Sequence, residues 1–250
     1  MLKVKSVLVS QPKPETEKSP YFDLAENCKI KVDFRSFIHV EGVPAKEFRL
    51  QKINLQDYDS VIFTSRNAVD HYFRIAEEMR VKVSEEIKYF CISESTALYL
   101  QKYIVYRKRK IFYGQQTFSD LISVIKKHKE GNFLLPSADI LRQDIPDSLN
   151  ANNINYKIAT LYRTVCSDLS DLSDVNYDVL VFFSPSGIKS LFENFPKFKQ
   201  NNTRIAVFGP TTATAAEQAG LKIDISAPQP ESPSMTKALE LYIKKANKGK

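Results

Sequence analysis

Four apolar runs in this sequence are each followed at once by a turn rich in hydroxyl groups. Where a helix follows a strand, such a turn leaves the first backbone N–H groups of the helix unpaired, at the positive end of its dipole. A carboxylate or phosphate fits that position well, although Ser and Thr also serve there as ordinary helix caps. One such turn predicts only a cap, whereas four together favour a site for an anion with many oxygens. The four turns are Thr64-Ser65-Arg66-Asn67, Ser93-Glu94-Ser95-Thr96, Ser184-Pro185-Ser186-Gly187 and Gly209-Pro210-Thr211-Thr212.

The sequence lacks the patterns of several other kinds of site. Among its seven glycines there is neither a G-x-G-x-x-G nor a G-x-x-x-x-G-K-[ST] cradle for nucleotides. It has no G-x-S-x-G elbow and no Cys–His signature, so a nucleophilic hydrolase is not supported. The cysteines and histidines are scattered, which predicts free thiols in a reducing compartment, no metal site and no cofactor. These residues are Cys28, Cys91, Cys166, His39, His71 and His128.

The charge balance favours an anionic partner. Lys and Arg number 36 against 29 Asp and Glu, and the resulting net charge of +7 attracts anions at long range. The basic runs at 106–110 and 126–129 are typical of solvated surface, and no nucleic-acid-binding motif accompanies them. No apolar stretch approaches the ~20 residues of a membrane span, and the N-terminus has no signal-peptide pattern. We expect a soluble, cytoplasmic protein that binds neither nucleic acid nor membrane.

The elements that must position these turns alternate along the chain. Short runs of continuous apolar residues are separated by helical patterns, which is typical of parallel strands covered by helices on both faces. The fold class is therefore α/β, and the number of strands favours two sheets. The main predicted strands are SVLVS (6–10), SVIFTS (60–65), KYFCIS (88–93), NFLLP (132–136), DVLVFFS (178–184) and RIAVFG (204–209).

Two pairs of these segments match each other. The stretch YDSVIFTSRNAVDHYF (58–73) aligns without a gap on YDVLVFFSPSGIKSLF (177–192), so that Ser65 falls on Ser184. KYFCISESTA (88–97) then aligns on RIAVFGPTTA (204–213), with Thr96 opposite Thr212. Two pairs at nearly equal spacing indicate two similar halves.

The first strand and two linker-like segments suggest how the halves are arranged. SVLVS precedes both repeats, HVEGVP (39–44) has turn and linker composition, and TVCSDLSD (164–171) is polar. We predict a discontinuous domain A of residues 1–38 plus 168–250 and an inserted domain B of residues 44–163. Segments 39–43 and 164–167 would connect them.

Several segments resemble the uroporphyrinogen-III synthase family. They are VIFTSRNAV, LVFFSPSGIKSLF, IAVFGPTTATAAEQAGL, FLLPSADILRQDIPDSL and the LYRT that ends 156–164, and the resemblance covers most of residues 56–240. It implies two similar α/β domains, each a parallel sheet flanked by helices, joined by a two-stranded connection with the active site in the cleft between them. It also implies a cofactor-free lyase reaction of haem-type (tetrapyrrole) biosynthesis, in which hydroxymethylbilane loses water and closes to uroporphyrinogen III with inversion of its last ring.

That reaction suits the residues. The implied substrate carries many carboxylates, which helix N-termini and a basic surface can hold. Loss of its hydroxyl gives a reactive azafulvene, so the protein needs no nucleophile. Because the bilane also closes unaided, but to the wrong isomer, the enzyme must position the chain so that the inverting path is favoured.

The resemblance also implies roles for particular residues. Tyr162 falls on the family's cleft tyrosine and is the predicted proton donor for the departing hydroxyl; a packed strand tyrosine is the alternative. The sequence departs from the family pattern at 19–28 and at Ser137-Ala138, where many relatives have Arg-Gly. The predicted substrate-binding residues are Thr64, Ser65, Arg66, Thr96, Ser184, Ser186, Gly187, Thr211 and Thr212.

A rival function stays open at this point, because fold alone does not assign function. A non-catalytic two-lobed α/β module could hold an anionic ligand or a protein partner in the same frame. For the synthase we expect a monomer whose partner is its small-molecule substrate, the polycarboxylate linear tetrapyrrole hydroxymethylbilane.

Overall fold

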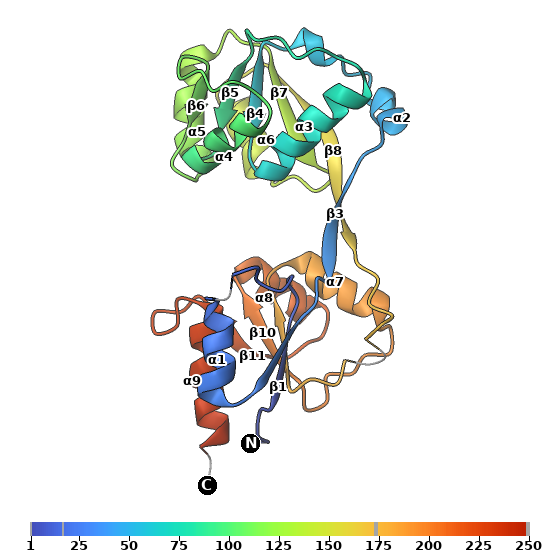
Figure 1. The fold of residues 1–250 in the computed structure, drawn as a ribbon, viewed down its shortest axis with the longest axis vertical. Helices are drawn as coiled ribbons and strands as arrows, with labels where there is room; N and C mark the ends of the chain where they lie inside the picture. The colour runs from blue at the N-terminus through green and yellow to red at the C-terminus, as the bar shows by residue number, and fades with distance from the viewer. Residues whose placement is uncertain (1, 17, 173–174, 249–250) are drawn as a thin grey trace. The chain divides into compact units, whose positions relative to one another are not determined.

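The structure is a computed structural model that describes residues 2–16, 18–172 and 175–248. The contacts within it divide the chain into two compact units (Figure 1). Unit 1 comprises Met1–His39 and Val165–Lys250, and unit 2 comprises Val40–Thr164. Each unit is an α/β fold, as the sequence predicted.

Unit 1 is built on a five-stranded sheet in the order β11-β10-β9-β1-β2. All of its recorded strand pairs are parallel. The apolar run near the N-terminus forms β1 and lies between β2 and β9, with Val7 opposite Val179. The strands are β1 (Ser6–Val9), β2 (Lys31–Phe34), β9 (Val179–Phe182), β10 (Arg204–Phe208) and β11 (Ile223–Ala227).

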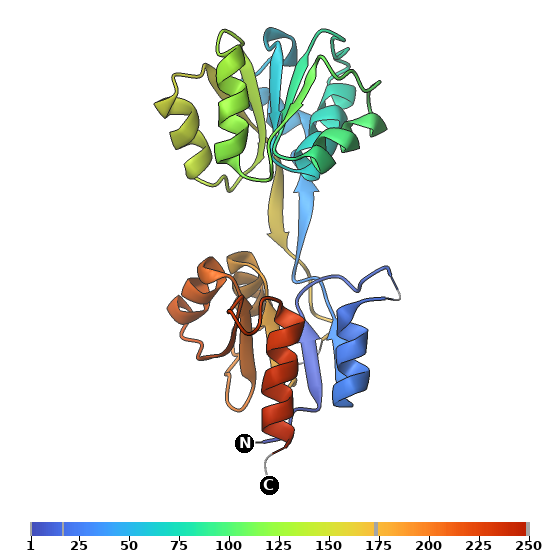
Figure 2. The ribbon, with the colours of Figure 1, turned by 90° about the vertical axis from the view of Figure 1, so that its left-hand side faces the viewer.

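Helices cover both faces of this sheet (Figure 2). Alternate residues of the buried strands point to opposite faces; thus Val7 joins the core under α1 and α9, and Leu8 the core under α7 and α8. The helices are α1 (Pro20–Cys28), α7 (Pro185–Asn194), α8 (Pro210–Gln218) and α9 (Met235–Asn247).

Unit 2 contains most of a six-stranded sheet in the order β3-β8-β7-β4-β5-β6. The strands β4 to β8 pair in parallel, while β3 and β8 extend past the boundaries of the unit. The segment 39–44, expected to have turn and linker structure, is mostly strand β3, whose neighbour Val43 donates its N–H to the Leu161 carbonyl. The strands are β3 (Ile38–Gly42), β4 (Ser60–Phe63), β5 (Lys88–Cys91), β6 (Ile111–Tyr113), β7 (Phe133–Ala138) and β8 (Tyr156–Cys166).

The helices of unit 2 also lie on both faces of their sheet (Figure 2). Helices α3 and α4 pack on the face that carries Val61 and Phe63, and α5 and α6 on the face that carries Ile62. A short α2 and several single turns of 3-10 helix complete the unit. The helices are α2 (Ala45–Phe48), α3 (Arg66–Glu78), α4 (Glu94–Tyr99), α5 (Phe118–Ile125) and α6 (Asp144–Ala151). Among the described residues, no helix combines the length and the apolar character that crossing a membrane requires.

Each sheet contains a point where the strand order reverses. In unit 1, β2 lies on one side of β1 while β9, β10 and β11 follow on the other. In unit 2, β5 and β6 extend from one side of β4, and β7 and β8 from the other. Ligands of open parallel sheets bind at the carboxyl ends of the strands at such a point. The fold therefore directs attention to the turns after β1, β9, β4 and β7.

Candidate functional site

The turn after β4 brings three of the predicted site residues together. Thr64 and Ser65 are half-buried and follow the strand directly. Ser65 is the N-cap of α3, and its hydroxyl accepts the N–H of Ala68 at 3.1 Å. The same hydroxyl oxygen lies 3.2 Å from the phenol oxygen of Tyr162. The capping oxygen and the predicted proton donor are thus hydrogen-bonded, although 97 residues separate them.

Tyr162 is held inside unit 2 by packing as well as by this hydrogen bond. It lies on β8 opposite Ala138 and is 7% exposed. Its ring stacks on the ring of His71 of α3, with 5.0 Å between centroids and 18° between planes. Burial raises the pKa of the phenol, and the hydrogen bond with Ser65 offsets part of that rise. The phenol is therefore protonated at neutral pH and able to donate.

The corresponding turn of unit 1 has the same cap. Ser184 is the N-cap of α7, and its hydroxyl accepts the N–H of Gly187 at 3.2 Å. Ser186 is half-buried and Gly187 is buried. A Cβ atom placed on Gly187 would lie 3.6 Å from the Ser184 hydroxyl and 3.8 Å from that of Ser10. Two hydroxyls from neighbouring strand ends therefore surround Gly187.

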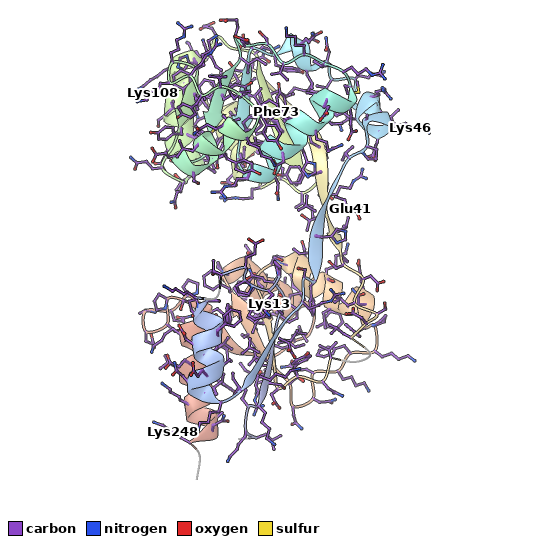
Figure 3. The ribbon with its side chains drawn as sticks, in the orientation of Figure 1. Lys13, Glu41, Lys46, Phe73, Lys108 and Lys248 are labelled. Atoms are coloured by element: carbon purple, nitrogen blue, oxygen red, sulfur yellow. The ribbon has the colours of Figure 1, made fainter. Side chains whose placement is uncertain are left out.

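Ser10 was not predicted as a site residue. It follows β1 at the reversal point, is 9% exposed, and donates its N–H to the Val181 carbonyl at 3.0 Å. The signal was present, since the run SVLVS ends in a hydroxyl as SVIFTS, KYFCIS and DVLVFFS do. Lys13 adds an exposed cation in the loop that follows (Figure 3).

The turn before α8 differs from the other three because it has no side-chain cap. The N-cap position is Gly209, whose φ of 85° suits glycine, and Pro210 occupies the first helical position. Thr211 is exposed, whereas Thr212 is only 1% exposed. No capping hydroxyl competes for the first N–H groups of α8. This turn is the most open of the four to an external anion.

The turn before α4 is closed by its own side chains. The Ser93 hydroxyl accepts the N–H of Thr96 at 3.4 Å and lies 3.2 Å from its hydroxyl. Thr96 is 4% exposed. In this conformation the Thr96 hydroxyl is hydrogen-bonded to the capping hydroxyl of Ser93, so a role in binding would need the turn to open.

Arg66, by contrast, is exposed and supported by an aromatic ring. Its guanidinium carbon lies 5.4 Å from the ring centroid of Tyr99. The Tyr99 hydroxyl donates to the Asp70 carboxylate at 3.0 Å, and Lys102 and Tyr103 donate to it as well. Burial favours a raised pKa for this carboxyl, but the three hydrogen bonds hold it below its usual value. Asp70 is therefore a carboxylate that fixes the ring beneath Arg66.

The last two residues of β7, Ser137 and Ala138, supply no cation. Ser137 is buried, and its hydroxyl donates to the Ala138 carbonyl at 3.0 Å. The N–H of Asp139 donates to the Tyr162 carbonyl at 3.0 Å. The register of β7 on β8 shifts between Ser137 and Ala138, so that Ser137 lies opposite Thr160 and Ala138 opposite Tyr162.

One hollow of unit 1 lies away from the predicted site residues. A cavity of about 720 Å³ in unit 1 is lined by residues 175–178 and 195–203, which precede β9 and β10 and include none of the predicted site residues. Among the residues described, no three His, Cys, Asp or Glu side chains gather as metal ligands. The buried Cys91 has its pKa raised by burial to about 12, so it is an inert thiol at neutral pH.

Comparison with known proteins assigns the chain to a family. A family model described as uroporphyrinogen-III synthase HemD matches residues 24–237. The uroporphyrinogen-III synthase of Chlorobaculum parvum is 25% identical over 255 residues, covering 96% of this chain and all of that one. That of Saccharomyces cerevisiae is 27% identical over 139 residues, 49% of this chain and 50% of the other.

Solved structures share the fold. Uroporphyrinogen-III synthetase of Helicobacter pylori aligns with a TM-score of 0.61 at 18% identity, covering 96% of this chain and 98% of that one. A mutant uroporphyrinogen III synthase of Thermus thermophilus aligns with a TM-score of 0.55 at 16% identity, covering 98% and 99%. At these identities the likeness concerns the fold alone.

Proposed function

The chain belongs to the uroporphyrinogen-III synthase family of porphyrin biosynthesis, and from that premise we propose that it closes hydroxymethylbilane to uroporphyrinogen III with inversion of the last pyrrole ring. The observation that carries the proposal is the family match, which extends over residues 24–237 and so over both units. The non-catalytic binding module considered from the sequence is not favoured, because the curated relatives are themselves named as synthases.

Tyr162 is the proposed general acid. Its buried phenol carries a proton at neutral pH and donates it to the hydroxyl of the substrate, which departs as water. The phenolate regains a proton when a ring carbon of the closed product is deprotonated to restore the pyrrole. The net reaction loses one water and needs no redox partner. The Ser65 hydroxyl oxygen, 3.2 Å from the phenol oxygen, positions the hydroxyl of Tyr162.

The remaining predicted residues are proposed to hold carboxylates. The uncapped first turn of α8, with Thr211 and Thr212, offers N–H groups and a dipole to one carboxylate. Ser184 can accept from the helix and still donate outward, since a hydroxyl does both. Arg66, over its aromatic support, supplies a cation that can pair with a carboxylate in bidentate fashion.

Other parts of the proposal rest on the sequence. We propose a cytoplasmic monomer that takes a tetrapyrrole substrate without a cofactor and binds neither nucleic acid nor membrane. Residues 1–38 plus 168–250 and residues 44–163 are the proposed domains.

The function is tested by incubating the purified protein with freshly generated hydroxymethylbilane. After oxidation, the porphyrin isomers are separated by chromatography. We expect isomer III in proportion to the protein added, with isomer I in the heat-denatured control. Isomer I alone in both reactions would refute the activity.

A further inference from the structure

Arg74 of α3 is the centre of a hydrogen-bond network beside Tyr162. One of its terminal nitrogens donates to the carbonyls of Val43, at 2.9 Å, and Leu161, at 3.2 Å. Its Nε donates to Nδ1 of His71 at 3.1 Å. The other terminal nitrogen pairs with the Glu78 carboxylate. A single guanidinium therefore joins the helix to the strand that carries Tyr162 and fixes the imidazole that stacks on it.

The backbone leaves a space for this guanidinium. A Cβ atom on Gly42 would lie 2.8 Å from three of the guanidinium atoms of Arg74. A Cβ atom does not approach other non-bonded heavy atoms that closely, so any side chain at position 42 must displace the arginine. Gly42 of β3 therefore leaves room for Arg74 of α3, and Arg74 in turn holds the ring of His71 by a hydrogen bond.

The hydrogen bond from Arg74 fixes the protonation of His71. A nitrogen that accepts an N–H carries no proton of its own, so the neutral ring has its proton on Nε2. Protonating Nδ1 would break this hydrogen bond and place two cations side by side. Burial and the charge of Arg74 lower the pKa of His71, while Asp70 and Glu78 oppose them. From β8, the phenol of Tyr162 faces the ring.

We propose that His71, held as its Nε2–H tautomer by Arg74 in the space left by Gly42, is a positioning residue that fixes the Tyr162 phenol for proton donation. The proposal rests on the acid role proposed for Tyr162. Stacking on His71, with 5.0 Å between ring centroids, fixes the orientation of the tyrosine ring. The Ser65 hydroxyl oxygen, 3.2 Å from the phenol oxygen, fixes the position of the phenol hydroxyl. A neutral imidazole also leaves the phenol its proton, whereas an imidazolium against the ring would favour the phenolate.

A double-mutant cycle separates positioning from packing. His71→Ala should lower kcat about tenfold and leave KM within about twofold, because the phenol loses its orientation while the binding turns stay intact. In the Tyr162→Phe background the same substitution should change kcat by less than about twofold. His128→Ala is the matched control, since His128 packs on Phe90 and Phe112 on the opposite face of the sheet. It should leave kcat unchanged.

Two further variants address the arginine without touching the ring. In the resting protein, the His71 C2–H resonance should titrate below its ordinary pKa of ~6.5. Arg74→Met and Gly42→Ala should each move that midpoint upward and move the acid limb of the kcat profile with it. Arg80→Met, which removes an exposed arginine just beyond α3, should move neither.

The outcomes are distinct. Equal losses from His71→Ala in both backgrounds, or an unmoved His71 midpoint in Arg74→Met, would overturn the positioning role. Full activity of Tyr162→Phe would instead refute the acid role, and with it the positioning role that depends on it, while leaving the synthase activity standing. If His71→Ala does not fold, His71→Gln takes its place, because it removes the stacked ring and keeps an oxygen that accepts from Arg74.

Discussion

Replacing Tyr162 by Phe removes one oxygen from the centre of the proposed site. The ring keeps its place, because its stacking on His71 and its burial at 7% exposure do not involve the hydroxyl. Only the 3.2 Å contact with Ser65 is lost, and that hydroxyl still accepts the N–H of Ala68. The substitution is thus a nearly isosteric deletion of the proposed acid.

The loss of the hydrogen bond and the loss of the general acid have different expected sizes. One neutral hydrogen bond contributes about 1 kcal/mol to stability, which for a chain of this size lowers the melting temperature by roughly 2–4 °C. General acid catalysis supplies about 10²–10⁴-fold in rate, and the lower end applies because the hydroxymethyl group is already labile. A hundredfold loss in kcat corresponds to about 2.7 kcal/mol. A lost ground-state hydrogen bond alone is too small to account for that loss.

The assay compares kcat for hydroxymethylbilane, product affinity and thermal unfolding in the same two proteins. We expect Tyr162→Phe to lower kcat by roughly 10–100-fold, to leave the Kd of uroporphyrinogen III within about twofold, and to melt only slightly earlier. An unchanged kcat with the correct isomer would show that Tyr162 is a packing residue. A fall in kcat that only follows the folded fraction would lead to the same conclusion.

Four other substitutions, one of them a control, test residues near Tyr162 and in the binding turns. Ser65→Ala and Thr117→Ala each remove a helix N-cap and should each lower the unfolding free energy by about 1 kcal/mol. Only Ser65→Ala should lower kcat, because Thr117 caps α5 away from the proposed acid. Equal kcat values of the two variants would show that Ser65 has no part in the site. Thr212→Val should weaken product binding about tenfold, by roughly 1–2 kcal/mol, with kcat nearly unchanged, as measured by titration; an unchanged Kd would exclude the hydroxyl from binding. Hydrogen bonds lower the folded-state pKa of the Asp70 carboxyl below 3.8, so its contribution to stability is present above that value and is lost as the pH falls through the folded pKa. Asp70→Asn should therefore destabilise the protein at neutral pH and flatten the fall of its unfolding free energy below about pH 4. Unfolding free energies of the two proteins that fall with the same slope against pH would contradict this.

The fold class was predictable because the buried strands are continuous apolar runs. VIF in β4 and VLVF in β9 are buried beneath helices on both faces and contain no polar residue. The edge strand β2 was missed for the opposite reason: KVDF has two charged residues and only partial burial, so it has no clear period. Helix α1 had a readable signal, since Ser19 caps it and Pro20 occupies its first position.

The candidate site was predictable only where a local pattern marks it. The matching positions of Ser65 and Ser184 follow from the repeat, and both are N-caps. His71 could not be found in this way, because its partner Tyr162 is distant in the sequence and only the packing of α3 on β8 brings the two rings together. Nor could the sequence show that the guanidinium of Arg74 occupies the space that a side chain at Gly42 would fill, because only the folded structure brings the two residues together.

The most direct test of closure with ring inversion follows the carbon atoms of the last pyrrole ring through the reaction. Hydroxymethylbilane is prepared with carbon-13 at its hydroxymethyl carbon and at the free α-carbon of its last pyrrole. Direct closure joins these two carbons, whereas closure with inversion attaches the hydroxymethyl carbon to the opposite α-carbon of that ring. If the account is right, the product formed with this protein shows no one-bond carbon–carbon coupling between the labels. A product in which the two labels are directly coupled, as in the reaction without protein, would contradict it.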